Sequence, residues 1–105
     1  MKRAGFRCEI NSDHKSFISR KTDMPYMETH HLIPLEYWRF FDNSLDVEAN
    51  IVCLCSNCHN EIHYGKYATK LIEPLFRKRK DELLKAGIDI EIYDLISMYN
   101  GDTIK

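Results

Sequence analysis

The chain has 105 residues and a mass of 12.5 kDa, which leaves room for one domain with a modest hydrophobic core. Its 44% hydrophobic and 30% charged residues are ordinary for a globular protein and exclude a disordered, collagen-like or coiled-coil chain. The formal net charge of -1 lacks the positive excess of most nucleic-acid-binding domains, so any basic surface must be local.

The first part of the chain predicts irregular structure followed by one strand. Residues 5–25 contain several turn-forming residues and one short strand-like piece. Residues 26–33 are aromatic and β-branched enough for a strand, which Pro34 should end because proline donates no backbone hydrogen bond. A short aromatic helix or loop is expected at residues 35–42.

A second strand and a helix are expected next. Residues 51–55 form a compact apolar run that is short enough for a buried strand. Ser56 can cap a following helix, which should end at Gly65. Two strands and a short helix therefore precede the last third of the chain.

The last third predicts two further helices. Residues 66–86 carry apolar side chains at helical spacing, so we expect a helix that Pro74 kinks or divides and that Gly87 ends. Asp89 can cap a last helix. The apolar residues of that helix are Ile92, Leu95, Ile96 and Tyr99.

Four cysteines and five histidines make the chain unusually rich in metal ligands for its length. The first eight residues lack the apolar stretch of a secretory signal, and no apolar run approaches the roughly 20 residues of a membrane helix. We therefore expect a cytoplasmic protein with no membrane partner. In that reducing compartment, cysteines indicate metal binding or redox chemistry, and the thioredoxin-like alternation that a redox role requires is absent.

A C-x-x-C pair, Cys55 and Cys58, lies where the second strand meets the following helix. Two thiolates at this spacing can bind one tetrahedral zinc ion, and a closed structural site needs two more ligands. Cys8 is the obvious third ligand, and His14 is the favoured fourth because it lies six residues later, across a turn. The alternative fourth ligand is Cys53, which would crowd one side of the ion beside Cys55. Otherwise Cys53 is expected to be a small buried hydrophobic residue.

The histidines predict a second ligand group. His59 and His63 are four residues apart on the expected helix, so both rings project from one face and can bind one cation. Cys58 is about 100° around that helix from His59, so one short helix can serve both sites. His30 and His31 are adjacent on the expected strand, where alternation points their rings to opposite faces. Both can serve one site only if the strand bends or its edge faces the site.

Together these residues resemble the motif of the HNH endonuclease family, which is named for its His-Asn-His residues. The resemblance covers roughly residues 8–65, and the tail is more weakly similar to the tails of HNH proteins from bacterial restriction and defence systems. It is carried by Glu28-Thr29-His30-His31-Leu32-Ile33-Pro34-Leu35, by Asn50-Ile51-Val52, and by Leu54-Cys55-Ser56-Asn57-Cys58-His59 with His63.

The resemblance implies an α+β fold, namely a small zinc-stapled ββα-metal domain of the HNH or His-Me finger type. Its zinc knuckle and ββα-metal core would occupy residues 8–65, with additional C-terminal helices at residues 66–105. The whole chain, residues 1–105, would then be a single nuclease domain.

The resemblance also implies catalytic roles. His31 matches the general base that activates water, and Asn50 matches the motif asparagine that fixes a loop and helps to orient the base. Glu28 matches an acidic residue that supports the histidines. The ligands of one catalytic divalent cation would be His30, His59 and His63. Imidazole suits Zn²⁺, Ni²⁺ or Mn²⁺, whereas the abundant Mg²⁺ prefers oxygen ligands, so all four remain candidates beside the structural Zn²⁺.

The implied activity is metal-dependent hydrolysis of DNA phosphodiester bonds within a restriction or defence system. The alternative is a non-catalytic zinc module that binds nucleic acid or protein, which the near-neutral charge favours. The one dense basic cluster could contact DNA or form a solvated helix face, and consists of Arg77, Lys78, Arg79 and Lys80. Because little room remains for a base-reading element, sequence preference is expected from a homodimer or from a fused or partner DNA-recognition domain.

Overall fold

The computed structural model describes residues 5–100 and confirms the α+β fold. Its strands β1 (Glu28–His31) and β2 (Ile51–Leu54) pair antiparallel in a two-stranded sheet. The three α-helices are α1 (Ser56–Tyr64), α2 (Thr69–Lys85) and α3 (Ile92–Tyr99). The connection between the strands contains the short 3-10 helices η2 (Leu35–Phe40) and η3 (Glu48–Asn50).

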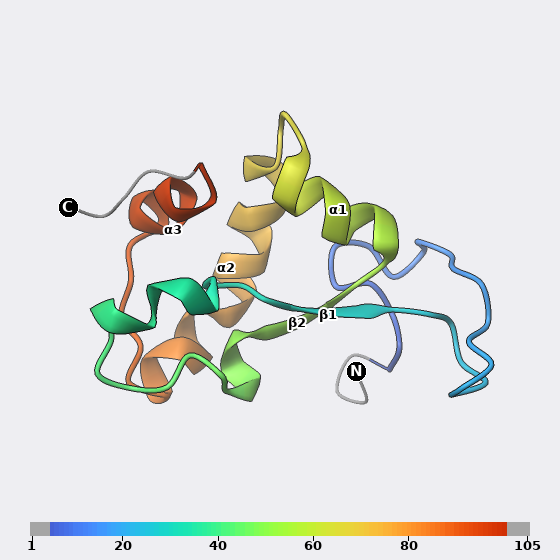
Figure 1. Ribbon diagram of the computed structural model, residues 1–105, viewed down its shortest axis with the longest axis horizontal. Coiled ribbons are helices and arrows are strands. Elements are labelled where there is room, and N and C mark those ends of the chain that lie inside the picture. Colours follow the sequence, from blue (N-terminus) through green and yellow to red (C-terminus); the bar gives the residue numbers. More distant parts are fainter. Residues whose placement is uncertain (1–4, 101–105) are drawn as a thin grey trace.

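Helix α1 lies over the strand pair, and α2 and α3 lie toward one end of it (Figure 1). α1 follows β2 directly and contacts both strands, and α2 packs against α1, α3 and η3. α3 lies at the end of the molecule opposite the N-terminal coil (Figure 1). One cluster of buried apolar side chains connects the strands with all three helices, and its most buried members include Leu32, Leu54, Ile62, Leu75 and Leu95.

The first strand is shorter than the sequence indicated. Residues 26–33 were expected to form it, but β1 spans only Glu28–His31. Tyr26 instead donates its backbone N–H to the carbonyl of Phe17, at 2.7 Å, in a small separate turn closed by a bridge between Ile18 and Pro25. That turn belongs to the N-terminal coil, so β1 begins only where the chain reaches β2.

The starts of two helices also differ from expectation. The N-terminal cap of α1 is Cys55, whose Sγ accepts the backbone N–H of Cys58 at 3.4 Å. Ser56 is not the cap, because its hydroxyl donates to Glu28 instead. The cap position of α3 is Glu91 rather than Asp89, because the helix begins only at Ile92, and no side-chain cap hydrogen bond forms there.

Pro74 does not divide α2, which is one helix of 17 residues. The buried residues Leu71, Ile72 and Leu75 anchor the helix on either side of the proline. Gly87 follows the helix with a φ of +80°, the left-handed conformation that favours glycine. Within residues 5–100, no helix is long and apolar enough to span a membrane.

Candidate functional site

Three cysteines and one histidine converge where the N-terminal coil meets the start of α1. Their ligand atoms all lie within 4.8 Å of one another, and the four residues are Cys8, His14, Cys55 and Cys58. His14 Nδ1 lies 3.3 Å from Cys58 Sγ and 3.7 Å from Cys55 Sγ. A tetrahedral zinc ion with usual bond lengths separates a nitrogen and a sulfur ligand by about 3.6 Å. The cluster therefore fits a structural zinc ion.

The coil that carries Cys8 is fixed to β2 by its neighbour Glu9. The Glu9 N–H donates to the Cys53 carbonyl at 2.8 Å, and the Cys53 N–H donates to Glu9 Oε2 at 2.7 Å. Burial opposes ionisation of Cys8, but backbone hydrogen bonds, chiefly from Cys55 and Asn11, lower its pKa to about 7. A pKa this low favours the thiolate that binds zinc.

Cys53 belongs to neither ligand group found in the described part of the chain. It is buried, and burial raises its pKa to about 11. The thiol therefore stays protonated at neutral pH, as a small apolar core residue would. His14 occupies the place for which Cys53 was the alternative.

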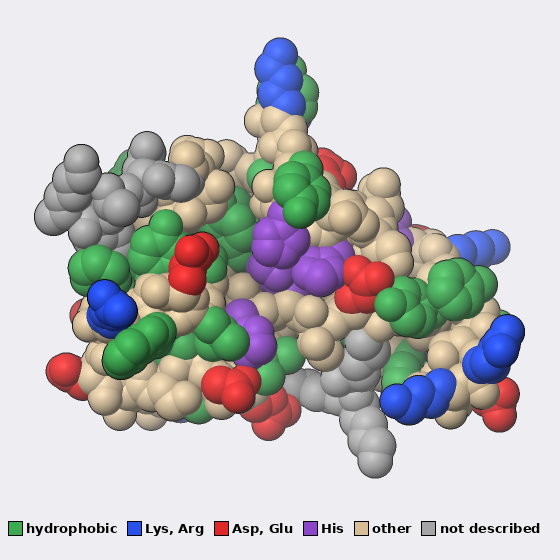
Figure 2. All heavy atoms as spheres, viewed as in Figure 1, with side chains coloured by type: hydrophobic (Ala, Val, Ile, Leu, Met, Phe, Trp, Pro, Cys, Tyr) green, Lys and Arg blue, Asp and Glu red, His purple; other side chains and the backbone are tan. Residues whose placement is uncertain are grey.

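A second cluster consists of His30 on β1 with His59 and His63 on α1. One ring nitrogen of each lies within 4.8 Å of the others, and the ring centroids are 4.8–5.2 Å apart. His30 is buried and His63 is exposed, so the cluster is open on one side. Figure 2 shows histidine side chains together at the centre of the molecular surface that faces the viewer. Three imidazoles that share an open position suit a divalent transition metal.

Two histidines of this cluster, His30 and His63, favour the neutral form that can bind a metal. Burial, with the neighbouring histidines, lowers the pKa of His30 to about 3. Burial and His59 also lower the pKa of His63. Since metal ligation requires a deprotonated ring nitrogen, the cluster is ready to bind a cation at neutral pH.

Glu28 orients His59 within the cluster. Its Oε1 lies 2.6 Å from His59 Nδ1, and its Oε2 accepts the hydroxyl groups of Tyr26 at 3.0 Å and Ser56 at 3.1 Å. The hydrogen bond with His59, more than any other contact, lowers the pKa of Glu28. An ionised carboxylate only accepts hydrogen bonds, so His59 Nδ1 carries the proton and Nε2 is left to bind a metal.

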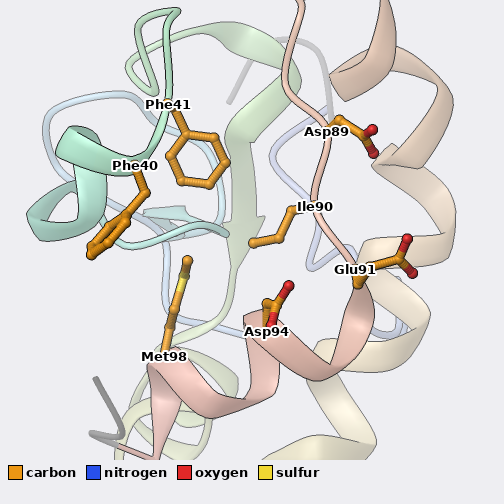
Figure 3. Close-up of a pocket in the computed structure, with 7 residues that line it drawn as sticks. All are labelled: Phe40, Phe41, Asp89, Ile90, Glu91, Asp94 and Met98. Atoms are coloured by element: carbon orange, nitrogen blue, oxygen red, sulfur yellow. The ribbon is translucent and has the colours of Figure 1, made fainter. Parts of the chain in front are cut away.

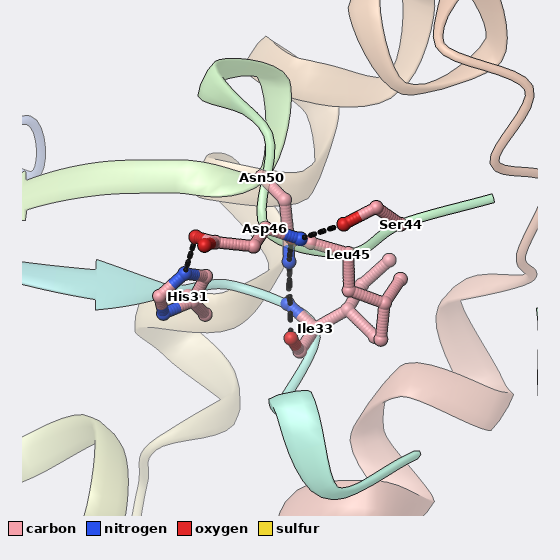
Figure 4. Close-up of polar contacts among 6 residues, drawn as sticks. All are labelled: His31, Ile33, Ser44, Leu45, Asp46 and Asn50. Carbon is pink, nitrogen blue, oxygen red and sulfur yellow. Dashed lines mark hydrogen bonds and ion pairs between the residues drawn. The ribbon is translucent and has the colours of Figure 1, made fainter. Parts of the chain in front are cut away.

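The adjacent rings of β1 have different partners, as strand alternation predicts. His30 Nε2 lies 2.6 Å from the Tyr99 hydroxyl, whereas His31 Nε2 lies 2.8 Å from Asp46 Oδ1 (Figure 4). The side chain of His31 is 29% exposed and that of Asp46 is 70% exposed, so this pair is accessible to water. The sequence patterns indicate neither Tyr99 nor Asp46 as a site residue, because no motif spacing connects them with the histidines.

Asn50 is fully buried and joins two loops (Figure 4). Its Oδ1 accepts the N–H of Ile33 at 2.7 Å, and its Nδ2 donates to the carbonyls of Ile33 at 3.1 Å and Leu45 at 2.8 Å. Ile33 follows the end of β1, and Leu45 immediately precedes Asp46. Asn50 therefore fixes the backbone on both sides of the pair formed by His31 and Asp46.

The basic cluster on α2 is not uniformly exposed. The side chain of Arg79 is only 4% exposed and forms an ion pair with Glu9, at 2.7 Å. Arg77, Lys78 and Lys80 are exposed, and Lys78 Nζ donates to the Glu9 carbonyl at 3.0 Å. The guanidinium of Arg79 lies inside the protein, so the surface that this cluster offers to DNA is smaller than the sequence indicated.

An open pocket of about 300 Å³ lies between the end of η2 and the segment that leads into α3, together with α3 itself (Figure 3). Three of its residues are acidic and would repel a phosphate group. None of its residues belongs to either metal-ligand cluster. The lining consists of Phe40, Phe41, Asp89, Ile90, Glu91, Asp94 and Met98.

Comparison with known proteins places the chain in a family and identifies a similar protein. Residues 7–65 match the family described as HNH endonuclease. Over 52 residues the chain is 48% identical to the type IV methyl-directed restriction enzyme EcoKMcrA of Escherichia coli (strain K12). That match covers 50% of this chain but only 17% of the longer enzyme.

Proposed function

Because the chain belongs to the HNH endonuclease family, we propose that it is a metal-dependent nuclease that hydrolyses phosphodiester bonds in DNA. The observation that carries this proposal is the convergence of His30, His59 and His63, with the water-accessible His31 following His30 on β1. The similarity to a restriction enzyme supports a role in a restriction or defence system. Such a role would place the protein in the cytoplasm, where a restriction enzyme meets the DNA that it cleaves.

The three clustered histidines would hold one divalent cation, with His59 binding through Nε2 because Glu28 occupies its Nδ1. When bound, such a cation stabilises the negative charge that develops on the scissile phosphate and on the leaving 3′ oxygen. The exposed His63 marks the side from which a phosphate group can approach. Mg²⁺, Mn²⁺, Ni²⁺ and Zn²⁺ are the candidates, of which the three transition metals suit imidazole ligands.

His31 would act as the general base. Its Nε2–H donates to Asp46, so its Nδ1 can accept a proton from water. The water oxygen then forms a bond to phosphorus as the bond from phosphorus to the 3′ oxygen breaks. This in-line displacement leaves a 5′-phosphate end, and the departing 3′ oxygen takes a proton from solvent water to become the 3′-hydroxyl end. The carboxylate of Asp46 orients the ring and stabilises the imidazolium that forms.

Asn50 would support this reaction as a positioning residue. All its side-chain polar groups bond to the backbone of Ile33 and Leu45, so it has no role at the phosphate itself. By joining these segments, it holds His31 and Asp46 at a fixed separation. Glu28 would act in the same way on His59.

DNA binding by this region alone should be weak and salt-sensitive. The net charge is -1, and within the α2 cluster Arg79 is buried, Lys78 donates to the Glu9 carbonyl and Arg77 lies 3.7 Å from the carboxylate of Glu73, so little positive charge is available to phosphates. The chain spans 17% of the restriction enzyme that it matches, so recognition of a target would come from a fused or partner domain or from a homodimer. A second copy would double the exposed basic surface.

A plasmid-nicking assay tests the proposed function. The zinc-loaded protein is incubated with supercoiled plasmid and Mg²⁺, Mn²⁺ or Ni²⁺, beside a His31→Ala variant whose zinc content and folding are verified. We expect nicking by the parent protein and its loss in the variant. If no divalent cation produces cleavage by the parent, the nuclease proposal is wrong and a non-catalytic zinc module is the better description.

A further inference from the structure

The hydroxyl group of Tyr99, near the end of α3, lies between two groups of the β1 segment. It donates to the Leu32 carbonyl at 2.5 Å, and it lies 2.6 Å from His30 Nε2. A carbonyl oxygen can only accept, and the hydroxyl has a single hydrogen atom. The hydroxyl hydrogen therefore belongs to the bond with Leu32, and His30 Nε2–H is the donor in the bond to Tyr99.

This arrangement determines which nitrogen of His30 can bind a metal ion. A neutral imidazole carries one proton, and Tyr99 holds that proton on Nε2. The lone pair of Nδ1 is then the one available to a cation. The ring itself cannot rotate without breaking the bond to Tyr99, since His30 is buried with 5% of its surface exposed.

We propose that Tyr99 is a positioning residue of the catalytic metal site, which holds His30 in the tautomer and orientation that bind the cation through Nδ1. This inference rests on the proposed function, because it assumes that the histidine cluster binds a divalent cation. Outer-shell hydrogen bonds of this kind are a general feature of histidine ligands and typically contribute about 10–100-fold to metal affinity.

Tyr99 and Glu28 act on different ligands in the same manner. Glu28 holds the proton of His59 on Nδ1, and Tyr99 holds that of His30 on Nε2. The two acceptors differ in charge, since Glu28 is ionised whereas burial raises the pKa of Tyr99 and keeps its hydroxyl neutral. Because only Glu28 is anionic, the groups around the histidine cluster carry less negative charge than they would if both acceptors were carboxylates.

The position of Tyr99 gives the C-terminal helix a part in the site. The match to the HNH endonuclease family ends at residue 65, and α3 begins only at Ile92. Helix α3 is fixed by the buried Leu95 and Met98, and the hydroxyl of Tyr37 donates to the Met98 carbonyl at 3.3 Å. The metal site of this chain is therefore completed by a helix outside the family match.

Calorimetric titration of the zinc-loaded protein with Ni²⁺ tests the proposal. The parent is compared with Tyr99→Phe, which keeps the ring, and with Tyr93→Phe, a control on the same helix whose side chain is 79% exposed. His63→Ala removes a ligand and identifies the binding event that belongs to the cluster. We expect Tyr99→Phe to weaken Ni²⁺ binding about 10–100-fold and Tyr93→Phe to leave it unchanged.

A purely structural role of Tyr99 would lower the melting temperature without changing the Ni²⁺ affinity of the folded protein, so equal affinities in parent and Tyr99→Phe overturn the inference. Nitrogen NMR of the metal-free protein adds an independent readout. The proton of His30 should reside on Nε2 in the parent and distribute over both nitrogens in Tyr99→Phe. If the parent binds no Ni²⁺ at the cluster, the proposed function itself fails, which is a different result.

Discussion

Replacing Asn50 by alanine should destabilise the protein strongly, because this side chain satisfies three buried backbone groups. Asn50→Ala removes the partner of the Ile33 N–H, the Ile33 carbonyl and the Leu45 carbonyl. A buried polar group that loses its partner costs about 1–3 kcal/mol, so three such groups give about 3–9 kcal/mol. Because water can enter part of the vacated space, we expect a loss of about 3–5 kcal/mol.

Such a loss is a large part of the roughly 5–15 kcal/mol by which domains are usually stable. It is measured as the change in the free energy of unfolding by urea, with zinc bound in both proteins. Asn60→Ala is the matched control, because the exposed Asn60 amide makes one hydrogen bond, to the Ser56 carbonyl at 2.8 Å. The control should change stability by less than about 0.5 kcal/mol.

Asn50→Asp sharpens the test. Aspartate keeps an acceptor for the Ile33 N–H but has no N–H groups to donate to the two carbonyls, and it introduces a buried charge. It should therefore destabilise at least as much as alanine does, although its volume matches that of asparagine. A loss below about 1 kcal/mol in Asn50→Ala would refute the reasoning, since the three hydrogen bonds would then contribute little.

Three further predictions concern the zinc ion, the base and the buried ion pair. Cys58→Ala, or removal of zinc by a chelator, should unfold the domain as followed by circular dichroism, and a variant that melts like the parent contradicts the zinc assignment. Asp46→Ala should lower the nicking rate constant roughly tenfold, because a positioned general base accelerates a reaction by ~10²–10⁴-fold and Asp46 contributes part of that acceleration. The Ni²⁺ affinity of the variant should be unchanged. Arg79→Ala should destabilise by about 3 kcal/mol because it leaves the carboxylate of Glu9, whose side chain is only 14% exposed, without its cation, whereas Arg77→Ala should have little effect on unfolding.

Short-range spacing accounts for the parts of the site that the sequence could predict. The C-x-x-C pair and the i, i+4 histidines fix the directions of four side chains on one short helix, because helical geometry is the same in every protein. His14 could be grouped with Cys8 because a turn of six residues limits where its ring can reach. The alternation of β1 likewise predicts different partners for the adjacent rings of His30 and His31, which contact Tyr99 and Asp46 respectively.

Long-range partners could not be predicted in this way. Tyr99 is 69 residues from His30, and the helical pattern of α3 indicates a buried face but not the group that the hydroxyl meets. Asp46 lies in a polar turn where its carboxylate resembles that of any exposed acidic residue. The burial of Arg79 depends on Glu9, 70 residues away, so a run of four basic residues could not reveal that one of them faces inward.

The helix-cap signal in the sequence also failed, because the hydroxyl of Ser56 has a second possible partner. Ser56 has the residue type of a helix cap, but its hydroxyl donates to Glu28. The cap position passes to Cys55, whose sulfur accepts the N–H of Cys58. The capping rule describes oxygen acceptors, so it does not include the sulfur of a cysteine.

The rate of plasmid nicking as a function of metal concentration tests the central claim most directly. If His30, His59 and His63 bind the catalytic cation and His31 is the base, the metal concentration at half-maximal rate should match the calorimetric dissociation constant of the cluster. His63→Ala should raise that concentration, whereas His31→Ala should lower the maximal rate at an unchanged midpoint. The account would be contradicted if His31→Ala nicked at the parental maximal rate. It would also be contradicted if His63→Ala left the metal concentration at half-maximal rate unchanged.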